Sequence, residues 1–318
     1  MLLKEVLDLF ELLDTPAACG ETAKQLLLEN GADEVTVTTI EGAKGSTDCI
    51  KALIKGSNGK SSGGTAPTLG IIGRLGGLGA RPAMIGFVSD GDGALAALAA
   101  GLKLAKMHRN GDVLEGDVIV ATHICPDAPT QEHFPVPFMG SPISMVQCNM
   151  AEVDERMDAI LSIDTTKGNR VINLNGIAIS NTVKEGYILE VSNDLMDIYT
   201  TVTGKPPAIF PLAQQDITPY GNDLHHINSI LQPAVVTNAP VVGVAITAEM
   251  PTAGCATGAS RPVDVETAAR YAVEVAKFYG AGKCQFYSQG EFDHLIKLYG
   301  PMNRFQTFGE GMPVNEND

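Results

Sequence analysis

The chain has 318 residues, a formal net charge of −15 and a hydrophobic content of 44%. This length and apolar content supply a large core and fit one α/β domain. The acidity and the absence of a Lys/Arg cluster argue against nucleic-acid binding. No apolar run reaches the ~20 residues that cross a bilayer, so we expect no membrane partner. Because residues 2–13 resemble an amphipathic helix more than a signal peptide, we expect a cytoplasmic location.

The first third of the chain alternates between helical and extended patterns. The sequence predicts helices at 2–13 and 21–29, strands at 35–40, 48–56, 68–73 and 83–88, and a long helix after residues 89–93. A strand begins at residue 118. The order of strand 83–88, helix and strand 118 onward predicts a parallel βαβ unit.

After a Pro-rich loop that follows Phe134, the second half of the chain also alternates between extended and helical patterns. Extended segments are expected at 159–164, 171–183, 208–212 and 241–247, and helices at 192–204, 221–232, 263–280 and 291–299. We therefore predict a single α/β domain over residues 1–318. Its three layers are a central mixed, mostly parallel sheet with helices on both faces.

The stretch 116–134 begins as an apolar strand and becomes polar within a few residues. If the chain stays extended, His123, Cys125 and Asp127 project to one side, because side chains alternate with period two. Polar groups at the carboxyl end of a buried strand are the usual layout of an α/β site. The alternative is that His123 and Cys125 are satisfied core residues and Asp127 starts a turn. Use of Cys125 as a nucleophile with His123 as base requires a bend, because alternate residues stand about 6–7 Å apart.

Several segments together resemble the clan of di-zinc aminopeptidases, and within it the tetrahedral and glutamyl aminopeptidase group. The segments are DTPAACGET at 14–22, EGAKGSTDCIKALIKG at 41–56, VSDGDGALAALAAGLKL at 88–104, GDVIVAT at 116–122, AILSID at 159–164, GND at 221–223, and the stretch from VVGVAIT to VDVETAA. The chain also resembles an uncharacterised bacterial and archaeal family known as a domain of unknown function. The resemblance to the clan implies its fold, a metal-dependent peptidase or amidohydrolase activity, and zinc or another divalent cation.

The metal-ligand set that the resemblance implies is only partly present. Asp90 and Asp164 stand where the clan has a bridging aspartate and a later acidic ligand. Arg74 stands where the first histidine is expected. The segment HICPD replaces the glutamate pair, and residues 253–255 lack the last histidine.

Two interpretations of these strand ends remain open. In the first, Asp90, His123 and Asp164 are ligands of a nonstandard metal site, with Cys125 and Asp127 as further donors, and His123 and Asp127 act in catalysis. In the second, Arg74 forms an internal salt bridge with Asp90 or Asp164 in place of the metal ion. Helix capping is the alternative role for Asp90 and its neighbour Asp92.

Four residues are candidates for substrate binding. Arg74 and Arg81 flank a glycine-rich loop, and a guanidinium binds carboxylate or phosphate in a bidentate manner. Asp223 and His225 stand at an expected helix start, where one of His225 and His226 should face inward and the other outward. Their alternative role is a surface pair.

Two functions therefore remain. The protein is either a hydrolase of peptide or amide bonds with an altered metal site, or a catalytically degenerate relative that binds a small-molecule or peptide ligand, or a partner, without a metal. The glycine spacing alone gives weak support to a nicotinamide enzyme. We expect a homo-oligomer. The six scattered cysteines lack a CxxC pair and are expected to be reduced thiols.

Overall fold

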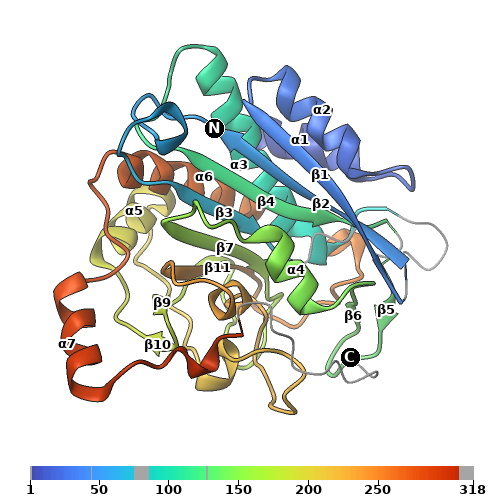
Figure 1. The fold of residues 1–318 in the computed structure, drawn as a ribbon. Coiled ribbons are helices and arrows are strands. Elements are labelled where there is room, and N and C mark those ends of the chain that lie inside the picture. The colour runs from blue at the N-terminus through green and yellow to red at the C-terminus, as the bar shows by residue number, and fades with distance from the viewer. Residues whose placement is uncertain (1, 44, 75–85, 127, 308–318) are drawn as a thin grey trace.

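The computed structural model describes residues 2–43, 45–74, 86–126 and 128–307. It is an α/β structure built on a nine-stranded mixed sheet with the order β1-β2-β4-β3-β7-β11-β9-β10, in which β8 also pairs with β11 (Figure 1). The strands are β1 Glu34–Gly42, β2 Gly45–Ile54, β3 Leu69–Gly73, β4 Val118–Ile124, β7 Ala159–Thr165, β8 Gly176–Ile179, β9 Val183–Lys184, β10 Tyr187–Ile188 and β11 Val241–Thr247. A separate pair is formed by β5 Thr130–Gln131 and β6 Phe138–Met139.

The centre of the sheet is parallel and its flanks are antiparallel. The strands β4, β3, β7 and β11 pair in parallel. The β1–β2 hairpin joins β4 antiparallel, and β8, β9 and β10 add antiparallel pairs beyond β7. The expectation of a mostly parallel sheet was therefore wrong, because hairpin strands extend a parallel centre on both sides.

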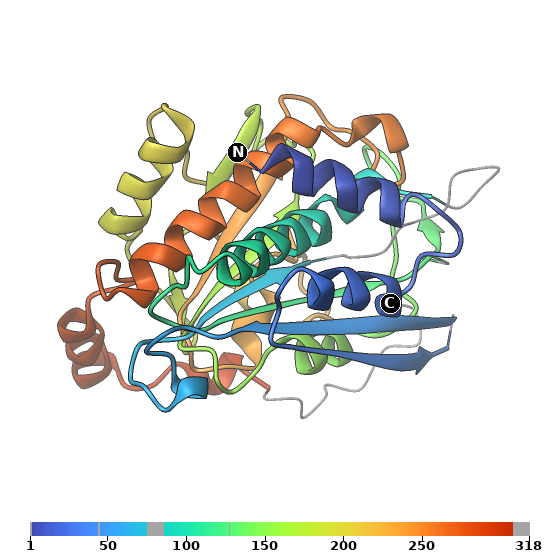
Figure 2. The same cartoon turned by 90° about the horizontal axis from the view of Figure 1, so that it is seen from above.

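The helices divide unequally between the two faces (Figure 2). One face carries α1 Leu3–Leu13, α2 Gly20–Glu29, α3 Asp92–Arg109, α5 Asn193–Thr203 and α6 Pro262–Gly280. The other face, which we call the α4 face, carries α4 Met145–Glu152 and irregular chain between residues 210 and 236. Helix α7, Gln289–Tyr299, lies at the periphery. Among the described residues, none of the helices is long and apolar enough to cross a membrane.

The side chains of each central strand alternate between two hydrophobic cores, one on each face of the sheet. In β4, Val120 faces the five helices while Ala121 lies on the α4 face, and β7 repeats this with Leu161 and Ile160. Because both faces are covered, these strands are apolar runs rather than alternating patterns. Burial of each Val, Leu or Ile side chain in these strands contributes about 1.5–3 kcal/mol before conformational entropy is subtracted.

Most expected elements are confirmed, but the βαβ unit uses a different first strand. The parallel neighbours β3 and β4 are joined through α3. Residues 86–88 form no strand, and residues 83–85 of that expected strand lie outside the described residues. Residues 208–212 form only an isolated bridge, between Ile209 and Ile179.

The structure differs from the sequence prediction at two places on the α4 face. The expected helix at 221–232 was wrong, because side chains capture its backbone amides: Asn222 Oδ1 accepts from Leu224 N and Asp216 Oδ1 accepts from Ile227 N. Such local bonds compete with the helical ladder. Helix α4 was not expected, although a capping box of Ser144 and Gln147 marks its start.

Candidate functional site

The candidate site lies at the carboxyl ends of β4, β3 and β7. The chain leaves β3 toward β4, whereas β11, the later parallel neighbour of β7, lies on the other side. Strand order therefore reverses between β3 and β7, the place where α/β sheets usually bind ligands. Arg74 directly follows β3, while His123 and Asp164 lie within the last two residues of β4 and β7. Their alternation with residues facing α4 places all three on the α4 face.

Arg74 forms a fully buried ion pair with Glu152, the last residue of α4. Arg74 Nη1 donates to Glu152 Oε2, and both side chains are 0% exposed. Arg74 Nη2 also contacts the sulfur of Met145, which lies about two turns before Glu152 on the same face of α4. Burial acts to lower the pKa of Arg74, but the charge and hydrogen bond of Glu152, together with other nearby acidic groups such as Asp164, raise it above its usual value. The guanidinium is therefore a permanent buried charge whose counter-ion is Glu152.

His123 shares the same carboxylate. Its Nδ1 lies 2.6 Å from Glu152 Oε1, and the His123 side chain is 3% exposed. Burial opposes the charge on Glu152, but the Arg74 charge and the His123 hydrogen bond hold its pKa below the usual range. Glu152 thus stays ionised, and it fixes the orientation of the His123 ring. We call Arg74, Glu152 and His123 the carboxyl-edge cluster.

Asp164 stands on the other side of Arg74 in a different environment. Its Oδ2 accepts from Ser229 Oγ at 2.8 Å and its Oδ1 from Thr165 N at 2.7 Å. Burial raises the pKa of Asp164, whereas these bonds and the Arg74 charge act in the opposite direction. Burial and then the Asp164 charge raise the pKa of Tyr220, a half-buried residue beside Ser229. Two carboxyls near one guanidinium therefore have opposite pKa shifts.

Asp90 and Asp92 do not cap α3, whose start has no side-chain cap bond. Asp90 Oδ2 accepts from Met139 N at 2.9 Å, and burial raises the pKa of Asp90 to about 7. Asp92 Oδ2 lies 2.5 Å from Lys167 Nζ. Lys167 has a φ of 44°, a strained conformation for a residue with a side chain. This second buried ion pair anchors the turn after β7.

The described residues do not fit the implied zinc ion. None of the described His, Cys, Asp and Glu side chains form a group of three or more able to hold a metal. Asp90, His123 and Asp164 are hydrogen-bonded to protein groups instead. Asp127, a further candidate donor and the second predicted catalytic residue, lies outside the described residues, as does the substrate-binding candidate Arg81.

The internal salt bridge expected for Arg74 exists, but its partner is Glu152 rather than Asp90 or Asp164. Asp223 and His225 are exposed on the loop at 221–226, apart from the buried cluster. His226 turns inward, as expected for one member of the pair: its ring lies 4.4 Å from that of Tyr220 and its Nε2 lies 3.0 Å from Thr218 O.

The cysteines near the cluster lack nucleophilic character. All six cysteines are free. Burial raises the pKa of Cys49 and of Cys148 to about 12. Cys125 is buried against Val88 and Met139, and its thiol donates to Ser46 O at 3.4 Å.

Sequence reasoning missed Glu152, Ser229 and Tyr220. The S-x-x-Q capping box at Ser144 was a readable signal for α4 and hence for Glu152. Ser229 and Tyr220 stand in irregular chain, where no pattern marks which side chains turn inward.

The fold and the site define an α/β protein whose polar strand ends are closed by an internal Arg–Glu–His cluster. Residues 38–309 match a family model described as "Protein of unknown function (DUF1177)", and the chain belongs to this family. The expected membership of an uncharacterised family is thereby confirmed. No curated protein matches the chain. The resemblance to the aminopeptidase clan stays a prediction.

Proposed function

We propose that this protein binds a small ligand without a metal ion, as a catalytically degenerate relative of the zinc-aminopeptidase fold. One observation carries the proposal: the fully buried Arg74, at the position where the resemblance implies a histidine ligand, is bound to Glu152. A guanidinium in this place neutralises a carboxylate that would otherwise be left buried and unpaired.

The charges around Arg74 support the proposal. Glu152 has a lowered pKa and is ionised, whereas the pKa of Asp164 is raised. The pair of Arg74 and Glu152 is neutral by itself. The pair therefore offers no net negative charge to a divalent cation, and the guanidinium itself repels one. Metal binding would therefore require the cluster to rearrange.

A second candidate function, amide hydrolysis by acid–base chemistry, is favoured by one arrangement. His123 is oriented by Glu152, as a general base requires, and Asp164 is a carboxyl with a raised pKa, as a general acid requires. His123 and Asp164 are both buried, so the chain around Ser229 would have to open to admit a substrate.

A hydrolysis assay separates the two candidates. Purified protein is incubated with chromogenic amino-acid anilides, with and without zinc or manganese, beside the His123→Ala variant. The binding proposal predicts the same background rate for both proteins under all conditions. Metal-dependent hydrolysis that is lost in Asp164→Ala would overturn it, and metal-independent hydrolysis lost in His123→Ala would establish the second candidate.

A further inference from the structure

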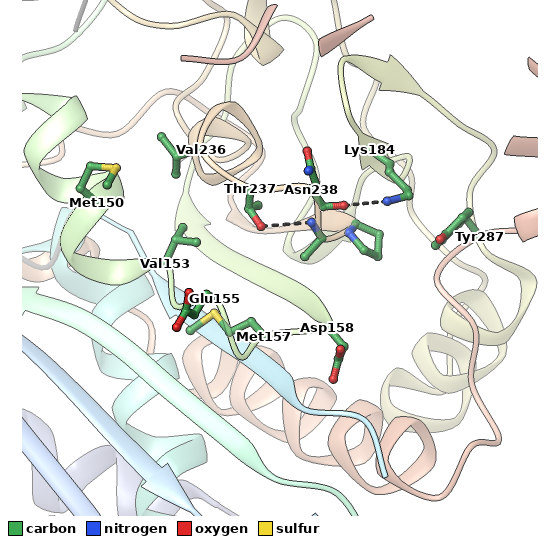
Figure 3. Close-up of a pocket in the computed structure, with 12 residues that line it drawn as sticks. Met150, Val153, Glu155, Met157, Asp158, Lys184, Val236, Thr237, Asn238 and Tyr287 are labelled. Atoms are coloured by element: carbon green, nitrogen blue, oxygen red, sulfur yellow. Dashed lines mark hydrogen bonds between the residues drawn. The ribbon is translucent and has the colours of Figure 1, made fainter. Parts of the chain in front are cut away.

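A pocket of about 530 Å³ opens at the amino ends of β7 and β11, at the opposite edge of the sheet from the carboxyl-edge cluster (Figure 3). The loops that precede the two strands form its sides, and α4 and β9 contribute further residues. The volume lies within the range of about 300–1,000 Å³ that is usual for small-molecule sites. The carboxyl-edge cluster is closed to solvent, whereas this pocket has room for a ligand.

The pocket is mostly apolar at one end, where Glu155 is the charged residue. Met150, Val153, Met157 and Val236 lie together on one side in Figure 3, away from Lys184 and Tyr287. Methionine side chains are flexible and adapt to apolar ligands of different shapes. This end therefore suits an aliphatic body.

Lys184 places an ammonium at the other end of the pocket, where Glu185 is its ion-pair partner. Its Nζ lies 2.7 Å from Asn238 O and 2.7 Å from Glu185 Oε1. The ammonium also lies 5.5 Å from the Tyr287 ring centroid and 5.0 Å from that of Phe292. An ammonium has three donors, and two of them have acceptors here. Among the described residues, the third N–H has no hydrogen-bond acceptor.

The pocket has two carboxylates, of which one is already committed. Asp158 Oδ1 lies 2.5 Å from Lys60 Nζ, and its Oδ2 accepts from Thr68 N at 2.8 Å. Glu155 is exposed and lies beside Met157 in Figure 3. Within the described part of the chain, its carboxylate has neither a hydrogen-bond nor an ion-pair partner. Glu155 is thus the group that can accept a cation.

We propose that this pocket binds a zwitterion whose ammonium and carboxylate are separated by an apolar body. The carboxylate bonds to Lys184, the ammonium to Glu155, and the body packs on Met157 and Val236. A short peptide and an ω-amino acid share this chemistry. The inference rests on the proposed binding function and names the class of ligand.

The test measures binding by titration calorimetry with two zwitterions, the dipeptide Leu-Leu and 6-aminohexanoate. The matched probes are hexanoate, which lacks the ammonium, and hexylamine, which lacks the carboxylate. At least one zwitterion is expected to bind about tenfold or more tightly than either singly charged probe, because each charge-assisted bond adds free energy. Preference for one zwitterion identifies the source of the ligand.

The variants Glu155→Gln and Lys184→Met should each weaken zwitterion binding by about tenfold or more. Glu132→Gln and Lys283→Met remove exposed charges away from the pocket and should leave binding unchanged. Glu155 is exposed, so its substitution keeps the test valid even if Lys184→Met disturbs folding. Absence of binding by either zwitterion, equal binding of the singly charged probes, or unchanged binding in Glu155→Gln would overturn the inference. Metal-dependent hydrolysis would sink the proposed function and leave a positive binding result intact.

Discussion

The Nδ1 atom of His123 lies 2.6 Å from Oε1 of Glu152, whose other carboxylate oxygen accepts from Arg74. A strand end, a helix end and a loop are thereby joined through one buried carboxylate. Removal of one partner from such a pair leaves an uncompensated buried charge, which is costly, whereas replacement of both by apolar groups is often close to neutral.

Glu152→Gln should destabilise the protein by about 3–5 kcal/mol, because the charge of Arg74 then stays buried without a counter-ion. Urea unfolding measures the change. Glu155→Gln, an exposed substitution three residues away, is the matched control and should stay within about 0.5 kcal/mol of the wild type. Equal stability of the two variants would show that Glu152 does not neutralise Arg74.

A double-mutant cycle tests whether the pair acts as a unit. Arg74→Met and Glu152→Leu should each be destabilising alone, because each leaves the other residue buried and charged. The double variant should be more stable than the sum of the single effects predicts, by about 1–3 kcal/mol. Additive losses in the unfolding free energy would contradict the pairing.

Asp90 should make stability fall as the pH rises. Burial raises its pKa from 3.8 to about 7, so the folded chain retains a proton that the unfolded chain releases between these values. The stabilisation is complete below the unfolded pKa and is lost as the pH rises through the folded one. Asp90→Asn removes this loss and should exceed wild-type stability at pH 7.5 by up to about 4 kcal/mol, but not at pH 4. A pH-independent difference between the two unfolding curves would refute the assignment.

Lys167→Met should cost about 3–5 kcal/mol, since Asp92 is fully buried and would lose its ion-pair partner. Arg170→Met, an exposed substitution in the same turn, serves as the control and should change the midpoint of urea unfolding little. If both variants unfold at the same urea concentration, the ion pair does not anchor the turn.

The regular elements could be predicted because their patterns are long or well bounded. Helix α6 has apolar residues at helical spacing, and β11 is a mostly β-branched run. Helix α4 was not predicted, because its eight residues have mixed polarity and therefore show little helical periodicity. The segment at 221–232 has helical spacing, but Asn222 and Asp216 bind its backbone amides, and the spacing does not reveal these competing bonds.

The sequence predicted which strand ends carry polar side chains, but not which groups these side chains are bonded to. The strand ends at Arg74, His123 and Asp164 were identifiable because polar residues interrupt apolar runs. The partner of Arg74 was not, because Glu152 stands on a helix that only folding brings across the sheet. The resemblance implied that Asp90 and Asp164 are metal ligands, whereas in the structure they accept hydrogen bonds from Met139 N and Ser229 Oγ.

The central claim, that a buried guanidinium occupies the place of a metal ion, is tested most directly by metal stoichiometry. Purified protein is dialysed to equilibrium against zinc, separated from free metal and measured by elemental analysis, together with Asp164→Ala. The account predicts far less than one zinc ion per chain and the same trace amount in the variant. One or more tightly bound zinc ions per wild-type chain, lost in Asp164→Ala, would contradict it.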